Sequence, residues 1–167
     1  RFDKENSPDN FYYHLVLLAE NNKGYDNLIK IVSYGFKDGF YYKPRVDIEL
    51  LEKYHEGIIA LSACLAGPVA RTIIRQSYDK GKEVALRYNN IFGENNFFLE
   101  LQDHMDGSVD QQTVNQSLMR MHQETGIPLV ATNDCHYISP EDAEAHDILL
   151  CIQTNTTVDE ADRMRYE

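Results

Sequence analysis

The sequence lacks the features that would place it in a membrane or a secretory pathway. No apolar run approaches the roughly 20 residues that a membrane-spanning helix needs. No secretory signal peptide opens the chain, and its first residue is Arg1 rather than Met. We therefore expect a globular domain that has been cut from a longer protein.

Cysteine is also scarce, with only Cys64, Cys135 and Cys151 in 167 residues. An odd and small number of cysteines does not build a disulfide framework. The count favours a reducing compartment, which we take to be the cytoplasm, with thiols that are free or bind a metal.

Basic residues are in the minority, since 16 Lys and Arg stand against 27 Asp and Glu, for a net charge of −11. An acidic surface repels phosphate backbones, so the chain is a poor candidate for holding duplex DNA by itself. The excess of acid suits a site for cations, or it serves ordinary solubility.

Two common catalytic motifs are missing as well. The sequence contains no glycine-rich phosphate loop and no Gly-x-Ser-x-Gly elbow. Internal repeats and low-complexity tracts are also absent. The chemistry must therefore be sought elsewhere in the pattern.

The apolar pattern that is present alternates between two periods. Short buried runs predict strands, and spacings of three and four residues predict helices. The strands are expected at 11–19, 57–64, 97–101 and 129–132, and the helices at 25–36, 47–54, 69–76, 80–92, 110–125 and from Pro140, capped by Ser139. This alternation predicts an α/β fold with parallel strands and outer helices.

Asp134 and His136 follow the last predicted strand. In extended backbone, residues spaced i, i+2 point to the same side, roughly 7 Å apart. A carboxylate and an imidazole at one mouth of a sheet form a usual geometry for holding a divalent metal. Turn chemistry, with Asp134 capping the next helix, is the alternative interpretation.

Three further metal-capable side chains lie in or after the other strands. His14 lies within the first strand, Cys64 ends the second and His104 follows the third. Each alone has an ordinary interpretation, as a core histidine or as a small apolar thiol. Together they predict a site for zinc, manganese or iron, which would activate water for the hydrolysis of phosphoesters.

Glu100 and Asp103 are candidates for an acid or a base near the same strand ends. Acidic side chains are mostly exposed. We therefore favour the interpretation that both belong to a solvated strand edge.

The segments 13–19, 21–28, 61–67, 98–104, 131–137, 142–147 and 149–154 occur in one order along the chain. In that order they closely resemble the PHP (polymerase and histidinol phosphatase) domain at the amino end of the alpha subunit of bacterial DNA polymerase III. The resemblance extends over essentially the whole chain.

The resemblance implies a distorted β/α barrel of seven strands. Here the barrel would be partial, because the family's first strands would precede Arg1. Residues 1–153 would form the partial PHP domain, and the polar segment 154–167 would lead toward the polymerase core.

The resemblance also implies a metal cluster. His14, Cys64, Asp134 and His136 fall on ligand positions, and His104 lies beside the site. The family's opening His-x-His and three further ligands would precede Arg1, so the fragment alone is expected to be inactive.

The implied function is DNA-directed DNA synthesis in replication, with a metal-dependent phosphoesterase or 3′–5′ exonuclease-type site in this domain. One alternative is a non-catalytic platform that stabilises the polymerase and docks a separate proofreading subunit. A free-standing phosphatase of the histidinol-phosphate type is a second, against which the sequence around His146 and Cys151 argues. The implied partners are DNA, the polymerase core and the proofreading subunit.

Overall fold

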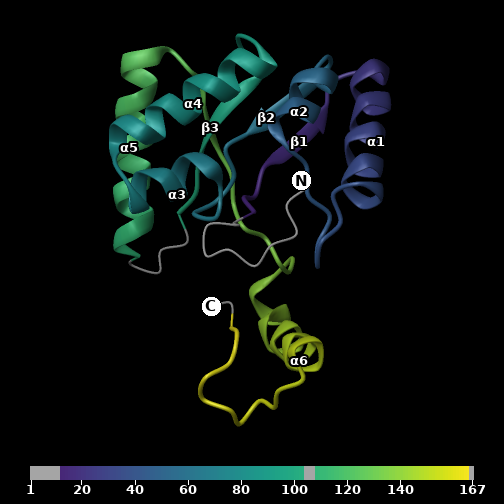
Figure 1. Ribbon diagram of the computed structural model, residues 1–167. Coiled ribbons are helices and arrows are strands. Elements are labelled where there is room, and N and C mark those ends of the chain that lie inside the picture. Colours follow the sequence, from purple (N-terminus) through teal and green to yellow (C-terminus); the bar gives the residue numbers. More distant parts are fainter. Residues whose placement is uncertain (1–11, 104–107, 166–167) are drawn as a thin grey trace. The chain divides into compact units, whose positions relative to one another are not determined.

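The computed structural model describes residues 12–103 and 108–165, and Figure 1 shows the order of the elements. The chain divides into two compact units, Arg1–Thr132 and Asn133–Glu167. The first unit holds the strands β1 (Val16–Ala19), β2 (Ile58–Leu61), β3 (Phe97–Leu101) and β4 (Leu129–Ala131). Its helices are α1 (Asn22–Lys37), α2 (Ile48–Tyr54), α3 (Pro68–Arg75), α4 (Tyr78–Phe92) and α5 (Val109–Thr125). The second unit holds a short 3₁₀ helix, η1 (Pro140–Asp142), followed by α6 (Ala143–Thr154).

The four strands form one sheet in the order β1-β2-β3-β4. The pairs β2–β3 and β3–β4 are parallel, but β1 is antiparallel to β2, with Val16 opposite Leu61 and Ala19 opposite Ile58. The prediction of parallel strands throughout is therefore wrong for β1. Two helices, α1 and α2, rather than one connect β1 to β2. The chain therefore enters β2 beside the point where β1 ended, and a hydrogen bond from the Glu20 N–H to the Gly57 carbonyl joins these two points.

β1 also differs from the buried strand predicted at 11–19. It begins only at Val16, so His14 precedes the strand, and the side chains of Val16 and Leu18 are exposed. An edge strand has one neighbour instead of two, which leaves an apolar run without full cover. The described part of the sheet is open, and the seven-stranded barrel stays a prediction.

The core of the first unit lies around the two central strands. Ile58, Phe97 and Leu99 are almost completely buried. Helices α4 and α5 pack against β3, whereas α1 packs against β1 and α2 (Figure 1). Burying each such side chain contributes about 1.5–3 kcal/mol, so the central strands hold the site described below on a rigid base.

The predicted helices of the first unit are all confirmed, and side-chain caps explain where several begin. Asn21 accepts a hydrogen bond from the Gly24 N–H at 2.9 Å, and Asp47 accepts one from the Leu50 N–H at 3.0 Å. Ser77 and Ser108 cap α4 and α5 in the same way. These bonds satisfy amides that lack partners within the first turn of a helix.

The second unit is small. The predicted start at Ser139 is confirmed, because the Ser139 N–H donates to the Asp142 carboxylate at 3.1 Å. Arg163 donates to both carboxylate oxygens of Asp147, which ties the segment after α6 back to that helix and lowers the pKa of Asp147. Over the described ranges, no helix has the length and apolar character needed to cross a bilayer.

Candidate metal centre

His14 and Cys64 meet in the first unit. The antiparallel pairing of β1 with β2 sets the start of β1 beside the end of β2, and the His14 N–H donates to the Ala66 carbonyl at 3.0 Å. The Nδ1 atom of His14 lies 3.7 Å from the Sγ atom of Cys64. Typical Zn–S and Zn–N bonds at a tetrahedral angle separate the two donor atoms by about 3.5 Å. The pair therefore fits as two neighbouring ligands of one cation.

A tight loop after β2 presents Cys64. Ala63 has a φ of 63°, a left-handed conformation that is uncommon for a residue with a side chain. The loop closes through a bond from the Gly67 N–H to the Cys64 carbonyl at 2.8 Å. A Cβ atom at Gly67 would lie 2.1 Å from the Ser62 carbonyl oxygen, so this turn accepts only glycine.

The buried Glu100 side chain holds the same loop through a hydrogen bond to its backbone. This side chain is 5% exposed, and its carboxylate accepts hydrogen bonds from the Ala63 N–H at 3.0 Å and from Gln102 Nε2 at 3.1 Å. The Thr132 hydroxyl donates to the same carboxylate. These donors replace water around the buried charge and hold Ala63 in its unusual conformation.

The interpretation of Glu100 as a solvated strand edge is therefore wrong, whereas Asp103 is exposed as that interpretation requires. Ser62 completes the link between the strands, because its hydroxyl accepts the Glu100 N–H at 2.9 Å. The sequence signal for this role was a single carboxylate within the apolar strand Phe97–Leu101. A carboxylate that is buried with such a strand needs hydrogen-bond donors from the protein around it.

Asp134 and His136 lie in the second unit, in a loop. β4 ends at Ala131, so the prediction that the strand itself ends in these two residues is wrong. The His136 Nδ1 atom lies 2.9 Å from the Asp134 backbone oxygen and 3.8 Å from its Oδ1 atom. A carbonyl oxygen only accepts, so Nδ1 is the donor in this contact and Nε2 is the ring nitrogen that could hold a metal. The alternative role of Asp134 as a helix cap is also wrong, because Ser139 occupies the cap of η1.

His146 was missed as a neighbour of this pair. Its ring centroid lies 5.7 Å from that of His136 and 5.4 Å from that of Tyr137. It comes from α6, ten positions after His136. No spacing rule links a loop residue to a helix residue at that distance along the chain.

The predicted ligands thus occur as two pairs, each within its own unit. His104 lies outside the described residues. Within 12–103 and 108–165, no group of three or more His, Cys, Asp and Glu side chains is gathered for a metal ion. A single cluster of all four ligands stays a prediction, while the donor types and the spacing of the first pair fit a metal.

The family model for the PHP domain matches residues 2–104, which include both His14 and Cys64. The chain belongs to the PHP-domain family. In this PHP domain, Cys64 and its loop lie at the carboxyl end of a central strand, and His14 precedes the antiparallel edge strand.

Relatives of this PHP domain extend the similarity past the family match. The chain is 45% identical to the DNA polymerase III subunit alpha of Borreliella burgdorferi, over 93% of the chain and 13% of that relative. It is 42% identical to the subunit of the same name from Treponema pallidum, over 100% of the chain and 14% of the relative. For the Thermus aquaticus subunit the identity is 41%, over 99% and 14%. The chain therefore spans about one seventh of the length of these relatives.

Proposed function

We propose that the chain is the PHP-domain part of the alpha subunit of a bacterial DNA polymerase III, whose full length carries out DNA-directed DNA synthesis in replication. The support is sequence identity of 41% to 45% to three such subunits over nearly the whole chain. DNA and the other parts of the polymerase are then its partners. A cytoplasmic location agrees with cysteines that form no disulfide among the described residues.

We further propose that His14, Cys64, Asp134 and His136 bind a divalent metal at a phosphoesterase site of the 3′–5′ exonuclease type. The observation that carries this proposal is the 3.7 Å approach of His14 Nδ1 to Cys64 Sγ. Nitrogen and sulfur donors favour zinc, and a carboxylate adds tolerance for manganese or iron. When bound, such a metal activates water and neutralises charge on the phosphate.

The protein's own residues prepare that site. Glu100 fixes Ala63 and thereby the backbone that carries Cys64. The Asp134 carbonyl oxygen accepts a hydrogen bond from His136 Nδ1. This bond orients the imidazole so that Nε2 is the nitrogen offered to the metal. Both contacts are made by the protein itself, and they orient the two candidate ligands.

Metal analysis of the protein as it is made in its own cell tests the proposal. Wild type should co-purify with zinc, manganese or iron. Cys64→Ala and the double variant Asp134→Ala, His136→Ala should lose that metal. Cys135→Ser is the matched control, because Cys135 is an exposed thiol outside the proposed set, and it should keep the metal. A wild-type protein without metal would overturn the site.

A non-catalytic platform is the second candidate, favoured by an apolar surface on α6. Ile148, Leu149 and Ile152 are 48%, 61% and 72% exposed, which suits contact with another chain such as a separate proofreading subunit. Release of nucleotides from a single-stranded oligonucleotide separates the two candidates. If wild type and the Asp134→Ala, His136→Ala variant release them equally slowly, the domain acts as a platform.

A further inference from the structure

The segment 40–45, Phe-Tyr-Tyr-Lys-Pro-Arg, has a composition unlike the rest of the chain. The whole chain has a net charge of −11, yet this segment holds two cations, three aromatic rings and no acid. It connects α1 to α2. Aromatic rings next to cations are the combination that binds single-stranded nucleic acid, through base stacking and phosphate contacts.

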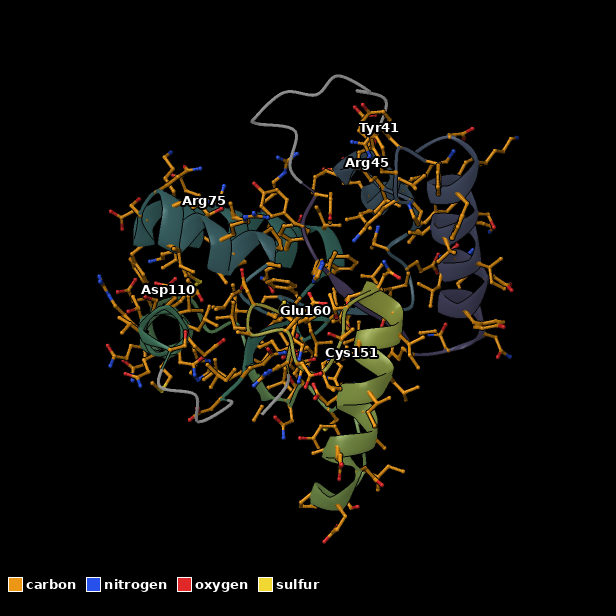
Figure 2. The ribbon with its side chains drawn as sticks, turned by 90° about the horizontal axis from the view of Figure 1, so that it is seen from below. Tyr41, Arg45, Arg75, Asp110, Cys151 and Glu160 are labelled. Atoms are coloured by element: carbon orange, nitrogen blue, oxygen red, sulfur yellow. The ribbon has the colours of Figure 1, made fainter. Side chains whose placement is uncertain are left out.

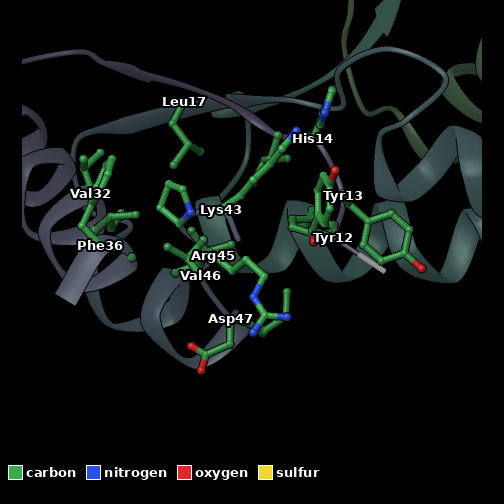
Figure 3. A pocket seen from close by; sticks show the side chains of 17 residues that line it. Tyr12, Tyr13, His14, Leu17, Val32, Phe36, Lys43, Arg45, Val46 and Asp47 are labelled. Atoms are coloured by element: carbon green, nitrogen blue, oxygen red, sulfur yellow. The ribbon is translucent and has the colours of Figure 1, made fainter. Parts of the chain in front are cut away.

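Lys43, Pro44 and Arg45 of this segment line a cavity of about 810 Å³ in the first unit. Tyr12, Tyr13 and His14 come from the stretch before β1, and Lys43 and Arg45 come from the segment 40–45 (Figure 3). Apolar side chains of β1, α1 and α2 complete the lining, among them Leu17, Ile31, Val32, Phe36 and Leu51. The volume lies within the range of small-ligand sites, roughly 300–1,000 Å³, which suits unpaired nucleotides rather than a duplex.

The rings at this cavity are available and are accompanied by cations. Tyr12 and Tyr13 are 47% and 48% exposed. The Nζ atom of Lys43 lies 5.1 Å from the centre of the Tyr12 ring, and the Arg71 guanidinium lies 6.0 Å from that of Tyr13. A base that stacks on either tyrosine therefore brings its phosphate close to a positive charge.

The loop is held in place by its own contacts. The Arg45 guanidinium lies 5.1 Å from the Tyr41 ring, beside which Figure 2 shows it, and its Nε donates to the Gly39 carbonyl at 3.5 Å. Asp47 is the acidic side chain among the cavity residues. Its carboxylate accepts the Leu50 N–H as the cap of α2, and this role accounts for an acid beside a proposed phosphate site.

We propose that this cavity binds the terminal nucleotides of single-stranded DNA, with the bases on Tyr12 and Tyr13 and the phosphates at Lys43 and Arg45. His14 belongs both to the cavity and to the candidate metal pair, so the bound strand end would lie beside Cys64. Delivery of a phosphodiester to the metal rests on the proposed function, whereas the binding itself does not.

Photocross-linking of the full-length protein tests the binding. An oligo-dT strand that carries 5-iododeoxyuridine at its ends is irradiated with the protein in EDTA, and the cross-linked residues are mapped by mass spectrometry. We expect cross-links at Tyr12 or Tyr13. Absence of any cross-link at the cavity, as when a polypeptide segment fills it, would overturn the proposal.

Matched variants test the stacking site by comparing cross-link yields between proteins, so that the conclusion does not depend on a single yield. Tyr12→Leu should weaken cross-linking at Tyr13 about tenfold, a loss typical of one stacked base, whereas Tyr12→Phe should stay within about twofold. Tyr25→Leu is the control, since Tyr25 is 59% exposed on α1 and does not line the cavity. Equal losses in Tyr12→Leu and Tyr25→Leu would refute a stacking site.

The charge contribution is measured separately. Lys43→Gln should weaken the salt dependence of cross-linking, lowering the slope of log affinity against log salt by about 0.7, with Lys37→Gln as control. Because metal is absent throughout, cross-links at the tyrosines stand even if the protein binds no metal. Conversely, a metal-loaded protein without cross-links loses this proposal and keeps the proposed function.

Discussion

The two candidate ligand pairs are held in different ways. His14 and Cys64 lie beside a buried network that runs from Glu100 through Ala63 to the Cys64 loop. Asp134 and His136 lie in an exposed loop, where the contact between them is local in sequence. The first pair depends on long-range structure, and the second depends on its own turn.

This difference shows where each pair is vulnerable. A buried polar network is costly when one partner is lost, because the remaining donors have no water to replace it. An exposed turn loses little, since water takes over its hydrogen bonds. Substitutions in the two regions should therefore differ in their effect on stability, even though both regions carry candidate metal ligands.

The largest effect is expected for Glu100→Ala. Three donors to the buried carboxylate lose their acceptor, and we expect a loss of about 3 kcal/mol in the free energy of unfolding. Urea unfolding measures it. Glu94→Ala, at an exposed position before β3, should change stability by less than about 0.5 kcal/mol. Similar losses of unfolding free energy in the two variants would show that the buried network around Glu100 does not stabilise the first pair.

Gly67→Ala should have the next largest effect. The added Cβ meets the Ser62 carbonyl oxygen, which forces the Cys64 loop open and costs about 2 kcal/mol. Gly126→Ala is the control: its φ is 76° with no atom within 4 Å of the added Cβ, so it carries only the backbone cost of about 1 kcal/mol. Thermal unfolding should rank the two variants in this order, and metal content should fall only for Gly67→Ala.

In the second unit, Asp142→Ala removes the carboxylate that accepts the Ser139 N–H. Loss of a helix cap costs about 1 kcal/mol, confined here to the start of η1 and α6. Hydrogen exchange should speed up at the first turn of α6 and remain unchanged at β2 and β3. Glu144→Gln, an exposed substitution on the same helix, should leave exchange as in wild type.

The smallest effect tests whether the loss of stability depends on how deeply a residue is buried or on which of the two units it belongs to. Glu124 on α5 accepts hydrogen bonds from Lys82, Tyr78 and Arg120, which lower its pKa to about 2. Because the folded pKa lies below the ordinary value of 4.5, the stabilisation is complete above pH 4.5 and is lost as the pH falls toward 2.

Glu124→Gln should therefore flatten the fall in stability between pH 4.5 and pH 2, and change little at pH 7 beyond the loss of an exposed ion pair. Urea unfolding at a series of pH values provides the curve, with Glu94→Gln as the control. A pH dependence identical to that of wild type would show that this surface cluster contributes nothing measurable.

The helices could be predicted because their signals are local. Asp47 and Ser139 identify helix starts from residues three positions apart, and the structure confirms both. The direction of β1 could not be predicted in this way. It depends on whether one helix or two fill the connection, and on how that connection returns to the sheet.

The candidate site divides along the same line. Sequence pattern identified His14 and Cys64, which the structure brings to 3.7 Å. It did not identify Glu100 as their support, because its donors at Ala63, Gln102 and Thr132 come from three different strand ends. Such a set forms only when the strands are already in register.

The reversed direction of β1 has a consequence for how variation in this chain should be interpreted. On β2 and β3, the residues near the candidate site are those that follow the strand in the sequence. On β1, the residues near the candidate site, such as His14, are those that precede the strand in the sequence. An insertion between His14 and Val16 would therefore displace the imidazole of His14 and the rings of Tyr12 and Tyr13 together, whereas an insertion just after Ala19 would leave all three in place.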